Sequence, residues 1–180
     1  MRVLGLDPGS RRTGYGVVEG EGNRFHAVTH GVITPRASRE LAPRLLAIVE
    51  GVRKVMDDTR PDAVVIEEAF YHESVRSTLV LGHVRGALLV AAAERGIPIG
   101  EYSPREIKLS VVGHGGATKE QVAFMVRRLL ALRTELASDA SDALAAAICH
   151  LQRARRTATA RPATLAGRRL EALLASRVRK

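Results

Sequence analysis

The chain has little of what disulfide-bonded or membrane-anchored proteins need. It contains a single cysteine among 180 residues, Cys149, which excludes an internal disulfide and fits a reducing compartment. No apolar run reaches the roughly 18 residues of a membrane span. The opening segment, MRVLGLDPGS, lacks the apolar stretch of a signal peptide, so we expect a cytoplasmic protein.

Aromatic side chains are also few, with three Phe, three Tyr and no Trp. Proteins that bind single strands stack successive bases on aromatic platforms, and six rings cannot build a large one. Positive charge, in contrast, is abundant, because the net charge at pH 7 is +9. A basic chain of this kind is drawn to polyanions. Together these features favour duplex or branched nucleic acid that is held through its phosphates.

The positive charge is concentrated at the C-terminal end. Nine Lys and Arg residues follow Gln152, against one acidic residue, Glu171. Segments with such a one-sided charge are typical of electrostatic arms. We therefore expect two parts, a globular domain over residues 1–155 and a flexible basic arm over residues 156–180.

The apolar pattern predicts a mixed α/β sheet with helices on both faces. Three short apolar segments separated by Gly-rich turns predict an antiparallel meander, and a fourth strand that follows a helix is expected to run parallel to the first. The predicted strands are 2–7, 13–19, 25–34, 63–67 and 97–102, and the predicted helices are 38–58, 74–95, one from Pro104, 119–132 and 139–153.

One segment of the second helix, residues 84–93, is apolar on nearly all sides. Such a segment is either deeply buried or part of an interface between two copies. We predict that it is the face of a homodimer, since a self-complementary surface generates a two-fold assembly. A charge placed in it, as in Leu88→Glu, tests that prediction.

Four carboxylates stand where this topology brings them together. Asp7 and Glu67 end two parallel strands, and Asp139 and Asp142 share one face of the last helix at positions i and i+3. Sites in open α/β sheets lie beyond the carboxyl ends of the strands. Ordinary turn and helix-cap roles, or salt bridges, also fit single members of the set, and Glu68 competes with Glu67 for the strand-end position.

A cluster of buried carboxylates is costly unless a cation compensates it. Oxygen ligands of this kind suit Mg²⁺ or Mn²⁺, and no His or Cys spacing indicates zinc. Two such ions hydrolyse phosphodiesters by activating a water and stabilising the leaving oxygen. The sequence therefore predicts a metal-dependent nuclease.

Basic and aromatic residues near this cluster are candidates for DNA contacts. A lysine in the first turn of a helix, such as Lys119, opposes the helix dipole and so suggests an anion to meet. An aromatic residue after the catalytic strand can insert between base steps. The candidates are Lys108, Lys119, Arg76, Arg85, Phe70 and Tyr71.

Four segments in order, GLDPGSRRTGYGV, VVIEEAFYHESVRSTLVLGHVRGALL, SPREIKLSVVGHGGATKEQVAFMVRRLL and SDASDALAAAICH, resemble the RuvC-type Holliday-junction resolvases over residues 1–152. The resemblance implies an RNase H-like fold and a homodimeric endonuclease with two Mg²⁺ ions per site, replaceable by Mn²⁺. It implies paired symmetric nicks in four-way DNA junctions and cooperation with a RuvA–RuvB branch-migration complex. It assigns the acidic tetrad to Asp7, Glu67, Asp139 and Asp142, and functional lysines to Lys108 and Lys119.

Three other functions fit parts of the pattern. Another RNase H-like nuclease, acting on RNA:DNA hybrids or other branched DNA, would use the same carboxylates. An actin-like ATPase also opens with a strand, Asp and Gly, but needs a second domain that 180 residues cannot hold. A purely binding module has no use for carboxylates in its core. Metal-dependent cleavage of a junction but not of a hybrid separates the first of these from a resolvase.

Overall fold

A five-stranded mixed sheet forms the centre of the computed structural model, which describes residues 1–21, 24–36, 38, 40–68 and 74–160. The strand order is β3-β2-β1-β4-β5, with the first three strands antiparallel and β4 and β5 parallel to β1. The predicted meander and the parallel fourth strand are therefore confirmed. The strands are β1 (Arg2–Asp7), β2 (Thr13–Glu21), β3 (Arg24–Ile33), β4 (Ala63–Glu67) and β5 (Ile99–Tyr102).

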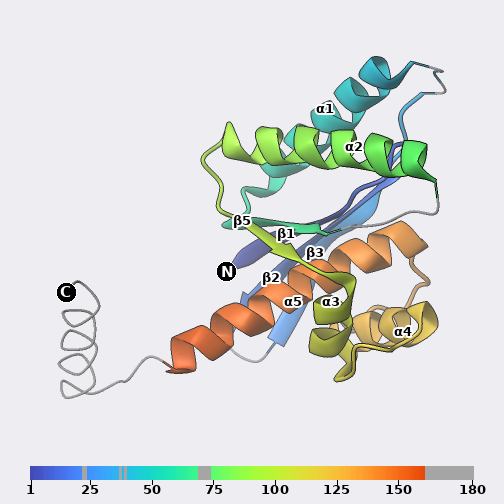
Figure 1. The fold of residues 1–180 in the computed structure, drawn as a ribbon. Coiled ribbons are helices and arrows are strands. Elements are labelled where there is room, and N and C mark those ends of the chain that lie inside the picture. Colours follow the sequence, from blue (N-terminus) through green and yellow to red (C-terminus); the bar gives the residue numbers. More distant parts are fainter. Residues whose placement is uncertain (22–23, 37, 39, 69–73, 161–180) are drawn as a thin grey trace, which may run out of the picture.

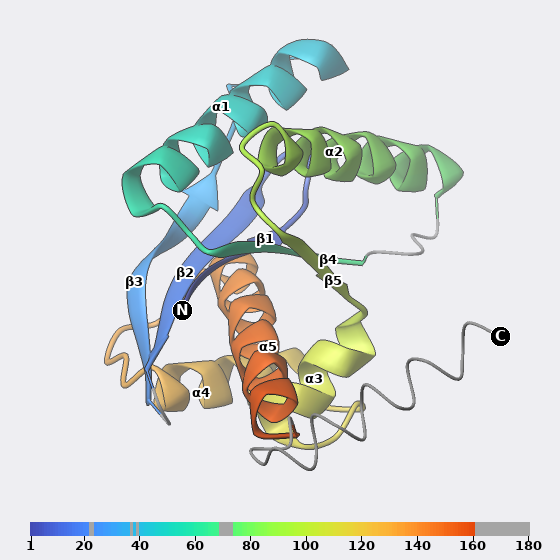
Figure 2. The same ribbon diagram turned by 90° about the vertical axis from the view of Figure 1, so that its left-hand side faces the viewer.

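Helices cover both faces of the sheet, as the α/β prediction required (Figures 1 and 2). Successive side chains of a strand point to opposite faces. Leu4 and Leu6 accordingly pack in the core under α1 and α2, whereas Val3 packs in the core under the other three helices. The helices are α1 (Leu41–Thr59), α2 (Val75–Ala93), α3 (Pro104–Val112), α4 (Lys119–Leu129) and α5 (Ser138–Ala160).

Two helices begin at the capping boxes that the sequence predicts. Ser103 accepts a hydrogen bond from the Glu106 backbone N–H while the Glu106 carboxylate accepts one from the Ser103 N–H, which starts α3. Thr118 and Gln121 make the same exchange at the start of α4. Each box satisfies two backbone donors that the helix itself leaves unpaired.

Other element ends differ from the predicted ones. The α1 helix begins at Leu41 rather than after Ser38, because Glu40 is the N-cap residue and the Ser38 hydroxyl accepts a hydrogen bond from the Glu40 N–H instead (3.1 Å). The last helix, α5, continues to Ala160, five residues into the segment expected as an arm.

The segment of α2 over residues 84–93 is not a dimer face as a whole, and that prediction is wrong for its buried members. Val84 and Leu88 are fully buried between α1 and the sheet, together with Ala91 and Ala92. By length and composition alone α2 would suffice to cross a membrane, which the prediction from apolar runs did not recognise. Its buried residues instead complete the core, so Leu88→Glu would report on folding and not on dimerisation.

The α5 helix lies directly on β1 and β2 because glycines face it. A Cβ atom on Gly5 would overlap the Ala143 carbonyl oxygen, and one on Gly14 would overlap the carbonyl of Asp139. A Cβ on Gly16 would meet the Leu144 side chain at 2.6 Å. Glycine in a strand interior allows this close approach of another backbone. The contact brings the first turn of α5 over the end of β1.

Candidate active site

The register of the parallel strands brings Asp7 and Glu67 to the same edge and face of the sheet. Leu6 of β1 pairs with Ile66 of β4, so the two acidic residues end their strands side by side. Alternate residues share a face, and Val65 packs in the core under α5. Glu67 therefore faces α5, as Asp7 does, while Glu68 occupies the alternate position. This register favours Glu67 over Glu68 as the site residue.

The first turn of α5 adds two more carboxylates above that edge. Asp139 lies over Gly14, which pairs with Asp7 in the neighbouring strand. Asp142 follows one turn later on the same helix face. Asp7, Glu67, Asp139 and Asp142 are all half-buried, so water screens their mutual repulsion only in part.

The electrostatics of the strand-end pair reflect this crowding. The pKa of Asp7 is raised to about 8, mainly because the carboxyl is buried and secondly because Glu67, Asp142 and Asp139 repel its charge. Burial, followed by repulsion from Asp142, raises the pKa of Glu67 to about 7. Pairs of carboxylates with pKa values displaced in this way mark functional sites more often than structural ones.

Two basic side chains compensate the α5 carboxylates. The Lys119 Nζ lies 3.3 Å from an oxygen of Asp142. The charge of Asp142, more than the charges of Asp7 and Glu67, raises the pKa of Lys119. The Arg12 Nε donates to Asp139 at 2.7 Å. Sequence reasoning missed Arg12. Arg12 could have been recognised because it lies in the same tight turn as Asp7. The buried Thr13 hydroxyl closes this turn by donating a hydrogen bond to the Gly9 carbonyl (2.7 Å).

The donor set fits a hard divalent cation by its chemistry. Four carboxylates supply oxygen ligands, and a bound cation would offset the burial and mutual repulsion that raise the pKa of Asp7 and Glu67. In the described ranges no group of three His, Cys, Asp or Glu side chains is arranged to hold an ion. Arg12 and Lys119 pair with Asp139 and Asp142. Release of these two ion pairs would make all four carboxylates available.

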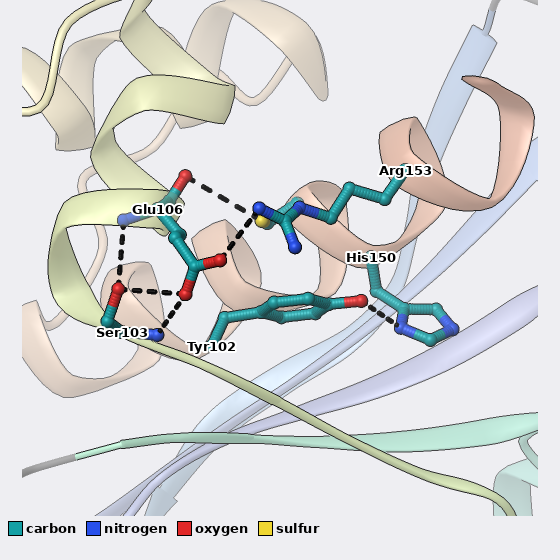
Figure 3. A network of polar contacts seen from close by, with 6 residues as sticks. Tyr102, Ser103, Glu106, His150 and Arg153 are labelled. Atoms are coloured by element: carbon teal, nitrogen blue, oxygen red, sulfur yellow. Dashed lines mark hydrogen bonds and ion pairs between the residues drawn. The ribbon is translucent and has the colours of Figure 1, made fainter. Parts of the chain in front are cut away.

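A polar network fixes the helix that carries Lys108 (Figure 3). Arg153 of α5 donates to Glu106 at 2.8 Å and its guanidinium lies over the Tyr102 ring, 4.8 Å from the centroid. The Tyr102 hydroxyl in turn contacts the His150 Nδ1 at 2.9 Å. These contacts hold the start of α3 against α5, and the positive charge of Lys108 lowers the pKa of Glu67.

The remaining predicted DNA contacts are not gathered in one place. Arg76 is exposed in the first turn of α2. Arg85, the other arginine of α2 predicted to contact DNA, forms an ion pair with Glu101 of β5. Phe70 and Tyr71 lie outside the described residues, and their predicted insertion between base steps stays a prediction.

Comparison with known proteins identifies relatives of this arrangement. The family model described as crossover junction endodeoxyribonuclease RuvC matches residues 3–150. The protein of that name from Caulobacter sp. (strain K31) is 50% identical over 150 residues, which cover 83% of this chain and 89% of the relative. The one from Geobacter sulfurreducens is 49% identical over 150 residues, covering 83% and 92%.

A solved structure matches the fold as well. The structure of Thermus thermophilus RuvC in complex with a Holliday junction substrate superimposes with a TM-score of 0.82 at 36% identity, covering 87% of this chain and 96% of that one. The α/β fold is thus the RNase H-like fold of the junction resolvases, as the motifs implied. With nearly half of the aligned residues identical and most of both chains covered, the chain belongs to the RuvC family of crossover junction endodeoxyribonucleases.

Proposed function

We propose that this protein resolves four-way DNA junctions by paired, metal-dependent nicks. The observation that carries the proposal is the convergence of Asp7 and Glu67 with the first turn of α5, where two further carboxylates stand. The names of the relatives and the junction bound to the Thermus thermophilus protein support a junction as the substrate. The basic charge of the chain suits a polyanion of this kind.

The side chains divide the work of hydrolysis. We assign Asp7, Glu67, Asp139 and Asp142 as ligands of two Mg²⁺ ions, with Mn²⁺ as a substitute. Ions held by these carboxylates would supply activation of the attacking water and stabilisation of the leaving oxygen. We assign contacts with the scissile phosphate to Lys119, which pairs with Asp142, and to Lys108, whose charge opposes the rise in the pKa of Glu67. Half-burial of the carboxylates limits access of bulk water.

The deciding experiment compares substrates. The purified full chain is incubated with Mg²⁺ and either a four-way junction or an RNA:DNA hybrid of the same sequence. We expect symmetric nicks in opposed strands of the junction and an intact hybrid. Cleavage of the hybrid with an intact junction would assign the protein to the competing class of RNase H-like nucleases.

Substitution of Lys119 tests its role at the phosphate. We expect Lys119→Met to lower the single-turnover cleavage rate by about 10²-fold, the usual effect of removing one charge that stabilises a transition state. Because Lys119 lowers the pKa values of Asp7 and Glu67, the variant should also need a higher pH to reach half of its maximal rate. Lys54→Met, at an exposed position of α1, is the control and should change neither quantity.

We infer that two copies pair through the exposed side of α2. Val75, Leu79 and Val90 are 76%, 61% and 57% exposed. At 3.6 residues per turn they lie within about 60° of one another around the helix. Gly82 and Gly86 lie between them with no atom within 4 Å of a built Cβ, which leaves room for a second helix. Two active sites related by a two-fold axis suit two opposed nicks.

The dimer interface is tested at exposed positions. Leu79→Glu and Val90→Glu should give folded monomers in analytical ultracentrifugation, since both side chains already face solvent. On a plasmid with an extruded cruciform, the monomers should leave nicked circles where the wild type produces linear DNA. Val28→Glu, on β3 and 43% exposed, is the matched control and should stay dimeric. Dimeric Leu79→Glu would contradict the assignment.

The remaining proposals concern the C-terminal arm, the protein partners and the two aromatic residues after β4. We propose that residues 156–180 act as a basic arm on DNA, because seven of their side chains are positively charged and one, Glu171, is negative. We also propose that the protein acts on DNA in the cytoplasm together with a RuvA–RuvB complex, as its membership of the RuvC family implies. Phe70 and Tyr71, which follow the strand that carries Glu67, are proposed to open the junction at its crossover.

A further inference from the structure

A second charged feature adjoins the carboxylate cluster. A cavity of about 1600 Å³ opens between the β1–β2 turn, the chain that follows β3, and the first turns of α1 and α2. In the ranges that the structure describes, its lining holds five arginines and no Asp or Glu. The arginines, which define what we term the arginine groove, are Arg11, Arg12, Arg36, Arg44 and Arg76.

Most of these arginines have donors to offer. Apart from Arg12, none of them forms an ion pair with another described residue. The Nε of Arg44 is buried and has no hydrogen-bond partner in the same part of the chain. Guanidinium groups match phosphate oxygens in geometry and charge. Like charges gathered without an acidic neighbour repel one another, so an anion that bridges them would stabilise this arrangement.

The residues that line the arginine groove indicate which part of a nucleic acid it binds. Among the described residues its lining also includes Pro8, Pro35, Leu41, Val80 and Leu81, and none of these is aromatic. Binding of unpaired bases relies on aromatic stacking, whereas duplex DNA is held mainly through its phosphates. The five arginines of the groove therefore suit the phosphate groups of a nucleic-acid backbone.

Arg12 connects the arginine groove to the carboxylate cluster. It lines the groove and also donates to Asp139, so the groove and the cluster share this side chain. The arginine groove is lined by residues from the starts of α1 and α2. Lys108 and Lys119 belong to α3 and α4, which lie on the opposite face of the sheet from α1 and α2 (Figure 1). Positive charge thus flanks the carboxylates on both sides of the sheet edge.

We propose that the arginine groove binds the backbone of the junction arm next to the cleaved phosphate, so that the scissile strand crosses the sheet edge from this groove to Lys119. The inference rests on the proposed function and adds the path of the DNA. In this arrangement Arg11, Arg36, Arg44 and Arg76 all contact phosphates of the bound arm.

Affinity and its salt dependence test the proposal. Binding of the full chain to a fluorescent four-way junction is measured in Ca²⁺ between 50 and 300 mM salt, roughly the range over which phosphate contacts dominate affinity. Arg44→Ala and Arg36→Ala should each weaken binding by about five- to ten-fold at 0.1 M salt and reduce the log–log slope by about 0.9. Arg36 is exposed, so its variant keeps the fold.

Arg53→Ala is the matched control. It removes the same charge from the same helix as Arg44, but Arg53 lies about 13 Å further along α1 and pairs with Glu94. Its affinity and salt slope should equal those of the wild type. Melting temperatures of all variants are recorded on the same preparations, to separate lost contacts from lost folding.

Neutral methylphosphonates locate the contact. Placed singly along the strand beside the scissile phosphate, they should weaken wild-type binding at positions on one side only. A methylphosphonate at those positions should not weaken the affinity of Arg44→Ala any further, because that variant has already lost the contact. Wild-type affinity in both arginine variants would overturn the inference and leave the groove to an acidic protein. A wild type that binds but never cleaves junctions would instead contradict the proposed function.

Discussion

Replacement of Asp7 by asparagine is expected to abolish junction cleavage while leaving junction binding in place. The substitution keeps the size of the side chain and removes one ligand charge, so the single-turnover rate should fall by at least about 10³-fold. Affinity should persist, because it comes from phosphate contacts elsewhere. Glu67→Gln and Asp142→Asn should behave alike. Glu50→Gln neutralises an exposed carboxylate on α1 and should cut normally.

The same substitution should make the metal-free protein more stable. The pKa of Asp7 is raised from 3.8 to about 8, so the folded protein holds a proton that the unfolded chain releases. The free energy of unfolding therefore falls as the pH rises from about 4 to about 8. Asparagine cannot ionise and escapes that loss. At pH 8 we expect Asp7→Asn to gain on the order of 1–3 kcal/mol, allowing for partial solvent screening of a half-buried group.

Magnesium should reverse this order. A ligand that binds only the folded protein stabilises it by mass action. Differential scanning fluorimetry with and without Mg²⁺ should show a larger rise in melting temperature for the wild type than for Asp7→Asn. A variant that melts below the metal-free wild type would show that Asp7 supports the fold and does not strain it. A variant that cuts normally at saturating Mg²⁺ would remove Asp7 from the site.

Local chemistry made much of the fold predictable. The capping boxes at Ser103 and Thr118 depend on residues three apart, and β4 is a short apolar run after a helix, so each is readable from a few neighbouring positions. The approach of Asp7 and Glu67 follows from strand direction and period-two alternation alone. In α2, however, apolar residues surround the helix, and no pattern within it separates the buried Leu88 from the exposed Leu79.

Long-range contacts explain what the sequence could not tell. The ion pair between Arg12 and Asp139 joins residues 127 positions apart, and nothing near either residue announces the other. The arginine groove gathers residues from three separate segments of the chain. Gly14 reads locally as a flexible strand residue, yet its function is to let Asp139 come close. Such roles arise only when the chain is packed.

Substitution of the glycines under α5 is expected to cause a large loss of stability. Gly5→Ala should destabilise the protein by about 3 kcal/mol or more, which corresponds to a melting temperature lower by about 6–12 °C for a chain of this size. The added Cβ overlaps the Ala143 carbonyl and lies 2.9 Å from the Ala147 nitrogen. Both are backbone atoms of a helix and cannot rotate away, so α5 as a whole must move off the sheet.

Gly116→Ala is the control for the loss of glycine itself. The nearest atom to a Cβ built there is the His114 Nδ1 at 3.9 Å, and the position is not in the left-handed region. Alanine at such a site stabilises by about 0.4–1 kcal/mol, because it restricts the unfolded chain. Thermal melts of the two variants should therefore move in opposite directions. Equal melting temperatures would show that α5 tolerates a methyl group beneath it.

Gly14→Ala separates the position of the site from the stability of the core. Its Cβ would overlap the Asp139 carbonyl and lie 3.0 Å from the Asp139 Cβ, so only the first turn of α5 must shift. We expect a smaller loss of stability than for Gly5→Ala but a cleavage rate lower by about 10²-fold, since misplacement of reacting groups by about 1 Å costs that much. The rate should stay low well below the melting temperature. Normal cleavage by the folded variant would mean that the site does not depend on where α5 places Asp139.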